Sequence, residues 1–159
     1  MAINFNKLTI KSQEALQNAQ EIASSYSNQQ VEPEHLFAAL IQDKEGIVIS
    51  TIQKLGANAD HLKIKVGELL EKLPKVSGSG TGQNFSNETN AVLETAFKEA
   101  LNLKDEYVST EHILLALTEA KRSPVSELLK SQGITKNNVL KALKEVRGSN
   151  RVSGQNPED

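Results

Sequence analysis

Three histidines, at positions 35, 61 and 112, are the residues of this sequence whose side chains most readily suggest chemistry. Imidazole is a frequent zinc ligand, but a zinc site needs three or four ligands at characteristic spacings. The sequence contains no His-x-x-x-His or His-Glu-x-x-His pairing and no cysteine. We therefore expect the histidines to have structural or solvent-facing roles, and we expect no metal site.

A glutamate precedes two of the histidines, in Glu34-His35 and Glu111-His112. In the first turn of a helix, such a carboxylate interacts favourably with the helix dipole, which is the simpler interpretation. The two carboxylates could alternatively form equivalent sites that accept a cationic or guanidinium-bearing side chain of a peptide. The sequence leaves both interpretations open. The adjacent pair Asp105-Glu106 is more typical of a charged loop and helix entry than of acid–base catalysis.

The glycine-rich segment from Gly78 to Gly82 resembles a phosphate-binding loop in composition only. A Walker A loop ends in Gly-Lys-Ser/Thr, because the lysine neutralises the phosphates and the hydroxyl binds magnesium. Gln83 and Asn84 occupy that place here. No Gly-x-Ser-x-Gly elbow is present at a strand-to-helix turn either. We therefore expect a linker, and a chain that is not an enzyme and has no cofactor of its own.

The composition excludes several classes of partner. The 159 residues include 18 Lys and Arg against 20 Asp and Glu, a formal net charge of −2. This balance predicts no nucleic-acid partner, because such contacts usually need a basic face. No apolar stretch is long enough to span a bilayer, and the first residues do not resemble a secretory signal. We expect no membrane association and a cytoplasmic location, which the absence of cysteine fits.

The most informative feature of the sequence is an internal repeat. Val31-Glu-Pro-Glu-His-Leu and Val108-Ser-Thr-Glu-His-Ile begin at positions 31 and 108, an offset of 77 residues. The same offset aligns residues 8–70 with the second half without a gap, and apolar positions meet apolar positions. A match of this length indicates one structural unit present twice. Two residues that lie 77 positions apart are therefore counterparts in the two repeats.

Each repeat predicts four helices, so the fold class is all-α with about eight helices. Apolar residues at helical spacing place helix one at 10–25 and 87–103, with Thr9 as an N-cap and Ser86 near the other cap. Helix two starts at Pro33 in the first repeat and after the cap Ser109 in the second, and its apolar runs, 36–41 and 113–117, must be buried, so we expect them to form the two core centres. Helix three, at 47–55 and 125–132, ends at Gly56 and Gly133, and helix four follows Asn58 and Thr135.

These elements define the domain organisation. We expect one domain over 1–147, in which repeat one covers about 8–73 and repeat two about 85–147. The serine- and glycine-rich residues 74–84 predict a flexible linker between them. Residues 148–159 show no periodicity and predict a flexible tail that leads to a further module.

The duplicated Glu-His motifs, the preceding valines and the two short apolar helices resemble the Clp N-terminal repeat domain. Glu71-Lys-Leu-Pro-Lys-Val-Ser-Gly78 and Phe5-Asn-Lys-Leu-Thr9 are similar to the ClpB branch of that family. The resemblance covers about residues 3–150. It implies a pseudo-twofold helical domain tethered to a hexameric AAA+ motor that needs ATP and magnesium. That motor threads aggregated proteins through its pore and cooperates with the DnaK system. The resemblance implies that its N-terminal domain engages unfolded or aggregated polypeptide and regulates the motor.

The resemblance also implies candidate binding residues. Thr9, Asp105 and Glu111 match family positions tied to substrate interaction, and the helix that contains Leu93 partly lines a hydrophobic groove in relatives. One groove leucine of some relatives corresponds to His112 here. In the protease-partner branch the matching glutamates recognise phosphoarginine, so Glu34 and Glu111 imply the alternative of docking phosphoarginine-bearing proteins. Docking of a folded adaptor is a further alternative.

Overall fold

Residues 4–78, 81, 84–148 and 153–155 are described by a computed structural model of the chain. Within these residues the first repeat contains α1 (Ile10–Ser25), α2 (Pro33–Gln42), α3 (Ile47–Lys54) and α4 (Ala59–Glu71). The second repeat contains α5 (Asn87–Asn102), α6 (Thr110–Thr118), α7 (Pro124–Ser131) and α8 (Lys136–Arg147). A short 3-10 helix, η1 (Phe5–Lys7), precedes α1, and the strands β1 (Gln30–Val31) and β2 (Asn84–Phe85) have two residues each. The predicted all-α class is confirmed.

The predicted helix starts are confirmed because the capping residues act as expected. The Thr9 hydroxyl accepts the backbone N–H of Ser12 at 3.2 Å, and its counterpart Ser86 accepts that of Thr89 at 3.1 Å. Asn58 and Thr135 cap α4 and α8 in the same way. Each cap satisfies a backbone donor that the first turn would otherwise leave unpaired.

The predicted helix ends at Gly56 and Gly133 are also confirmed. Both glycines have positive φ, +80° and +76°, a conformation that other residues adopt only with strain. Helix two begins at Pro33 and, in the other repeat, at Thr110 directly after Ser109, so the starts marked by Pro33 and Ser109 are confirmed.

The two repeats are related by matching contacts across the molecule. Leu8 pairs with Val108 in a parallel bridge, and the counterparts of these two residues, Phe85 and Val31, pair in the same way in the β1–β2 ladder. The extended residue before helix one of each repeat therefore pairs with the residue before helix two of the other repeat. This interlocking was not predicted, because two-residue strands are too short to show an alternating pattern.

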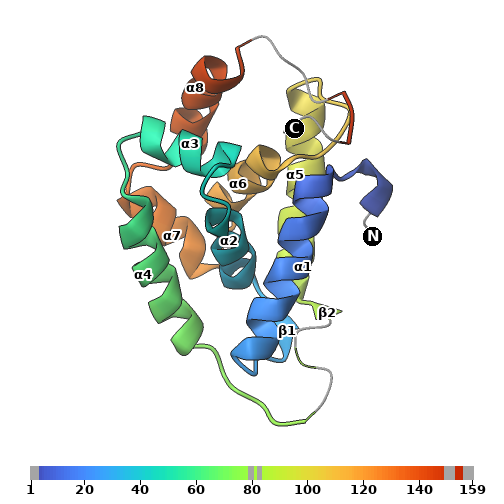
Figure 1. Ribbon diagram of the computed structural model, residues 1–159, viewed down its shortest axis with the longest axis vertical. Helices are drawn as coiled ribbons and strands as arrows, with labels where there is room; N and C mark the ends of the chain where they lie inside the picture. The colour runs from blue at the N-terminus through green and yellow to red at the C-terminus, as the bar shows by residue number, and fades with distance from the viewer. Residues whose placement is uncertain (1–3, 79–80, 82–83, 149–152, 156–159) are drawn as a thin grey trace.

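The core is centred on α2 and α6, as the sequence predicted. Figure 1 shows both helices in the middle of the molecule, with α1 and α5 on one side and α4 and α7 on the other. Every residue of both apolar runs is buried, and Leu36, Phe37, Ile113 and Leu114 are completely inaccessible to solvent. A helix that is apolar on all sides is stable only in such surroundings.

The described parts of the predicted linker and tail make contacts with α1 and its ends. Val76 N–H donates to the carbonyl of Ser27 at 2.8 Å, so the linker begins along the end of α1. At the other end of α1, the Ile10 N–H donates to the carbonyl of Gln155 at 2.7 Å. Residues 79–80, 82–83, 149–152 and 156–159, on which much of the linker and tail prediction falls, lie outside the described residues.

Candidate functional site

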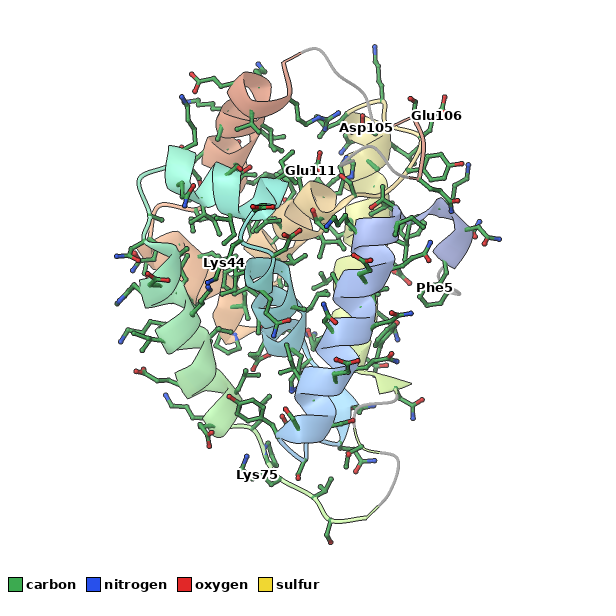
Figure 2. The ribbon with its side chains drawn as sticks, in the orientation of Figure 1. Phe5, Lys44, Lys75, Asp105, Glu106 and Glu111 are labelled. Atoms are coloured by element: carbon green, nitrogen blue, oxygen red, sulfur yellow. The ribbon has the colours of Figure 1, made fainter. Side chains whose placement is uncertain are left out.

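A cluster of buried polar side chains lies where α6 begins in the second repeat. We call it the buried cluster, and it consists of Asp105, Ser109, Glu111, His112 and Arg147. Figure 2 shows Asp105 and Glu111 near each other at this end of the molecule. Two of the predicted binding residues, Asp105 and Glu111, are thus brought together.

The histidine of the buried cluster has a definite tautomer. Its Nδ1 accepts the backbone N–H of Ser109 at 2.9 Å, so the ring proton is on Nε2. Nε2 then donates to the carboxylate of Asp105 at 2.7 Å. His112 thereby closes the first turn of α6 and holds Asp105 in place, which confirms the predicted structural role of this histidine.

Arg147, at the end of α8, supplies the positive charge of the buried cluster. Its guanidinium donates to both carboxylate oxygens of Asp105, at 2.9 and 2.7 Å, and lies 3.5 Å from Glu111. The Ser109 hydroxyl donates to the other oxygen of Glu111. Burial by itself would lower the pKa of Arg147, but the hydrogen bonds to Asp105 and the two carboxylate charges raise it. Arg147 therefore keeps its positive charge and is paired with both carboxylates inside the cluster.

The first repeat contains a neutral version of the same network. His35 accepts the Glu32 N–H at 2.8 Å on Nδ1 and donates from Nε2 to the amide oxygen of Asn28 at 2.7 Å. Asn28 is the counterpart of Asp105, and Leu70 is the counterpart of Arg147. Burial lowers the pKa of His35 to about 4, so this ring is neutral at pH 7. The structural role predicted for His35 is confirmed as well.

Glu34 differs from its counterpart Glu111 because the first repeat lacks the arginine. Its side chain is buried, and in the part of the chain that the structure describes no ion pair involves it. Burial raises the pKa of Glu34, and the nearby charge of Glu32 raises it further, although the backbone N–H of Glu34 opposes both effects. The first repeat thus holds a buried carboxylate without a cation.

The other two predicted binding residues have structural positions. Thr9 is buried as the cap of α1, and its backbone N–H donates to Val108 across the repeat interface at 3.0 Å. Leu93 is completely inaccessible inside α5. The expectation that Leu93 faces a ligand is therefore corrected, because in this conformation no ligand can touch its side chain. Any contact at Thr9 would need the cap to open.

An open hollow that the sequence analysis did not foresee lies between α1, α2 and α4. We call it the apolar groove, and its volume is about 530 Å³. Its lining is mostly apolar, with two lysines, and consists of Ile22, Ser25, Tyr26, Ala38, Ile41, Gln42, Lys44, Lys63, Val66, Gly67 and Leu70. Figure 2 shows Lys44 between the ribbons of α2 and α4.

The second repeat has different side chains where the first repeat has the apolar groove. Lys136 bridges Glu99 at 3.0 Å and Glu119 at 3.3 Å, which ties α5, α8 and the end of α6 together. Glu99 is the counterpart of Ile22, and Glu119 is the counterpart of Gln42. An ion bridge therefore spans the position that is open and apolar in the first repeat.

A comparison of counterparts could have indicated the apolar groove from the sequence. Ala38 and Gly67 stand opposite Leu115 and Lys144, so the first repeat has smaller side chains at two lining positions. The repeat alignment contained this difference, but only the structure places both positions on one hollow.

Neither a metal site nor a membrane span is found among the described residues. No three residues drawn from histidine, aspartate and glutamate are grouped there so that they could hold a metal ion. None of the described helices has the length and apolarity that crossing a membrane requires.

The fold and the site define an internally duplicated, all-helical domain with buried polar networks at two equivalent helix starts. Residues 7–132 match the family described as the Clp repeat (R) N-terminal domain. The chain belongs to this family, as its repeats and motifs had indicated.

Relatives in sequence are chaperones. Chaperone protein ClpB of Clostridium perfringens is 39% identical over 160 residues, and that of Bacillus anthracis is 40% identical over 159 residues. Both alignments cover 98% of this chain but 18% of the relative, so the chain spans about a fifth of the length of the curated relatives it matches.

Solved structures agree with the fold. The Hsp104 N-terminal domain of Candida albicans superposes with a TM-score of 0.80 at 26% identity, covering 94% of this chain and 97% of that one. A complex of a ClpV N-domain with a VipB peptide has a TM-score of 0.70 at 20% identity, with 98% and 96% covered. The second likeness concerns the fold alone.

Proposed function

We propose that this chain is the non-catalytic N-terminal domain of an ATP-dependent protein disaggregase, and that it binds unfolded or aggregated polypeptide weakly. The observation that carries the proposal is the apolar groove, a hollow whose floor is formed by the buried side chains Ile41, Val66 and Leu70 and whose edge includes the half-buried Ile22 and Tyr26. A concave hollow with a mostly apolar lining is typical of a binding site. The ClpV N-domain that binds a VipB peptide supports peptide binding as a use of this fold.

The energetics favour weak binding. A hollow of about 530 Å³ accommodates three or four apolar side chains. Each contributes roughly 1.5–3 kcal/mol on burial, while association opposes binding by something like 4–15 kcal/mol. A dissociation constant of ~10 μM or weaker follows from this balance. Several tethered copies in one assembly would raise the effective affinity.

The remaining components of this function lie outside the chain. The ClpB relatives are about five times longer, and we propose that the corresponding segment carries an AAA+ motor that uses ATP and magnesium in the cytoplasm, acts as a hexamer and works with the DnaK system. Thr9, Asp105 and Glu111 are all buried, so they would then act indirectly. Thr9 would stabilise the start of α1, and the two carboxylates would hold α8, the last helix, in place through Arg147.

Titration of the domain with a permanently unfolded, carboxymethylated protein tests the proposal. We expect saturable binding in the micromolar range or weaker, similar for unrelated unfolded sequences, and no retention of folded proteins from an unheated lysate. Nanomolar binding to one sequence would contradict it. Retention of a single folded protein, with none of the unfolded ones, would favour an adaptor-docking module instead.

A second candidate function is recognition of phosphoarginine-bearing proteins, which the unpaired Glu34 favours. Glu111 already has Arg147 as a guanidinium partner, whereas Glu34 has none among the described residues. Peptides that differ only in phosphoarginine against arginine test this function. We expect Glu34→Gln to abolish a phosphoarginine preference, with Glu106→Gln as an exposed control. Equal binding of the two peptides would dismiss this candidate.

A further inference from the structure

We propose that the apolar groove selects apolar segments that are flanked by aspartate or glutamate and disfavours segments flanked by basic residues. The proposal rests on the function proposed above and names the class of substrate sequence. It is based on the charges around the groove, on their pairing, and on the difference between the two repeats.

The charge of the lining has one sign. Lys44 and Lys63 line the groove, and no aspartate or glutamate does. In the part of the chain that the structure describes, neither lysine forms an ion pair. Lys75 also lies beside the groove, with its Nζ 5.1 Å from the ring centre of the lining residue Tyr26, but it is paired with Glu71 and is not counted as a free charge. An apolar peptide with acidic flanks would therefore meet free ammonium groups.

Glu21 and Glu45 adjoin the lining in sequence but are not among the residues that form it, and the nearby carboxylates Asp43 and Glu71 have lysine partners. Asp43 lies between the lining residues Gln42 and Lys44, and its carboxylate is 3.6 Å from Lys11. Glu71 follows Leu70, and its carboxylate is 3.9 Å from Lys75. These pairs reduce the negative potential that would repel an acidic segment.

The second repeat has an ion bridge where the first repeat has the apolar groove. The Glu99–Lys136–Glu119 bridge joins the helices there, and its lysine is shared by two carboxylates. Leu115 and Lys144 stand where the first repeat has Ala38 and Gly67. We therefore expect one such site per domain, in the first repeat.

The size of the charge preference follows from the two ion pairs that Lys44 and Lys63 would form with the acidic flanks of a bound peptide. Exposed pairs contribute modestly, so Lys44 and Lys63 together should give about a fivefold preference for acidic over uncharged flanks. The same charges should disfavour basic flanks by a similar factor. Because salt screens exposed charges, about 1 M NaCl should remove most of the difference.

Fluorescence anisotropy with three synthetic peptides tests the proposal. The peptides share one leucine- and phenylalanine-containing core and carry aspartate, serine or lysine flanks. We expect affinity to fall in that order, and we expect the double variant Lys44→Glu/Lys63→Glu to reverse it. Lys121→Glu, at the counterpart of Lys44, is the matched control and should keep the original order.

A variant that fills the groove distinguishes binding in the apolar groove from nonspecific binding elsewhere on the domain. A Cβ atom added at Gly67 meets no atom within 4 Å, and leucine favours a helix over glycine. Gly67→Leu should weaken the acidic peptide at least fivefold while the unfolding midpoint stays the same or rises. Lys144→Leu, its counterpart in the second repeat, should leave the affinity unchanged.

Three results would overturn the proposal. Equal or tighter binding of the lysine-flanked peptide would refute the charge preference. An acidic preference that survives both Lys44→Glu/Lys63→Glu and Gly67→Leu would place the site elsewhere. If no peptide binds while a carboxymethylated protein still does, this inference fails and the proposed function stands; if neither binds, both fail.

Discussion

Replacement of Arg147 by leucine should strongly destabilise the second repeat. The guanidinium makes two hydrogen bonds to Asp105, at 2.9 and 2.7 Å, and lies 3.5 Å from Glu111. All three side chains are almost entirely buried. The substitution would leave two carboxylates close together in the interior without a cation.

The expected loss is about 3–5 kcal/mol of unfolding free energy, the range for breaking a buried ion pair by removing one partner. The first repeat indicates how the loss can be relieved. There the counterparts of Asp105 and Arg147 are Asn28 and Leu70, and Asn28 still accepts a hydrogen bond from a buried histidine. Asp105→Asn combined with Arg147→Leu should therefore recover a large part of the lost stability.

Urea unfolding followed by far-ultraviolet circular dichroism measures these changes, since the sequence contains no tryptophan. Lys141→Leu, at an exposed position of α8, is the control and should change stability by less than about 0.5 kcal/mol. A loss below about 1 kcal/mol for Arg147→Leu would refute the reasoning. So would a double variant no more stable than Arg147→Leu alone.

Three further variants test other parts of the structure by the same unfolding measurement. Thr9→Ala should cost about 1 kcal/mol through loss of the cap of α1, whereas Thr9→Ser should cost less, and equal losses would contradict the cap. At pH 7, Glu34→Gln should raise stability by about 1 kcal/mol, because it removes a buried unpaired carboxylate, while Glu111→Gln should lower it; like signs would be inconsistent with the pairing described. His35 has a folded pKa of about 4 against 6.5 unfolded, so its contribution is complete above pH 6.5 and is lost as the pH falls towards 4. His35→Gln should reduce the pH dependence of stability in that window, and an unchanged slope would show that another group is responsible.

The helices could be predicted because their information is local. Thr9 and Ser86 mark the starts of α1 and α5, and Gly56 and Gly133 mark the ends of α3 and α7. Capping and helical periodicity act over a few residues, so they can be recognised along the chain. Because the two repeats carry matching caps and helix ends 77 residues apart, each helix boundary could be recognised twice.

The buried cluster was harder to predict from the sequence than the helices. Asp105 and Glu111 were identified as important acidic residues, but Arg147 was not, although it neutralises both. It lies 42 residues from Asp105 in the chain. A pairing at that separation depends on how α8 packs near α6, which no local pattern specifies.

The sequence by itself established a duplicated, helical domain, since helix propensity, capping and the 77-residue offset are properties of neighbouring or aligned residues. Only the tertiary structure decided how the repeats interlock, that Leu93 is inaccessible, and that one repeat closes its gap with an ion bridge while the other leaves it open. The physical reason is that burial and charge pairing arise between segments brought together by packing, and single side-chain differences such as Ala38 against Leu115 change the surface without disturbing the helices beneath it.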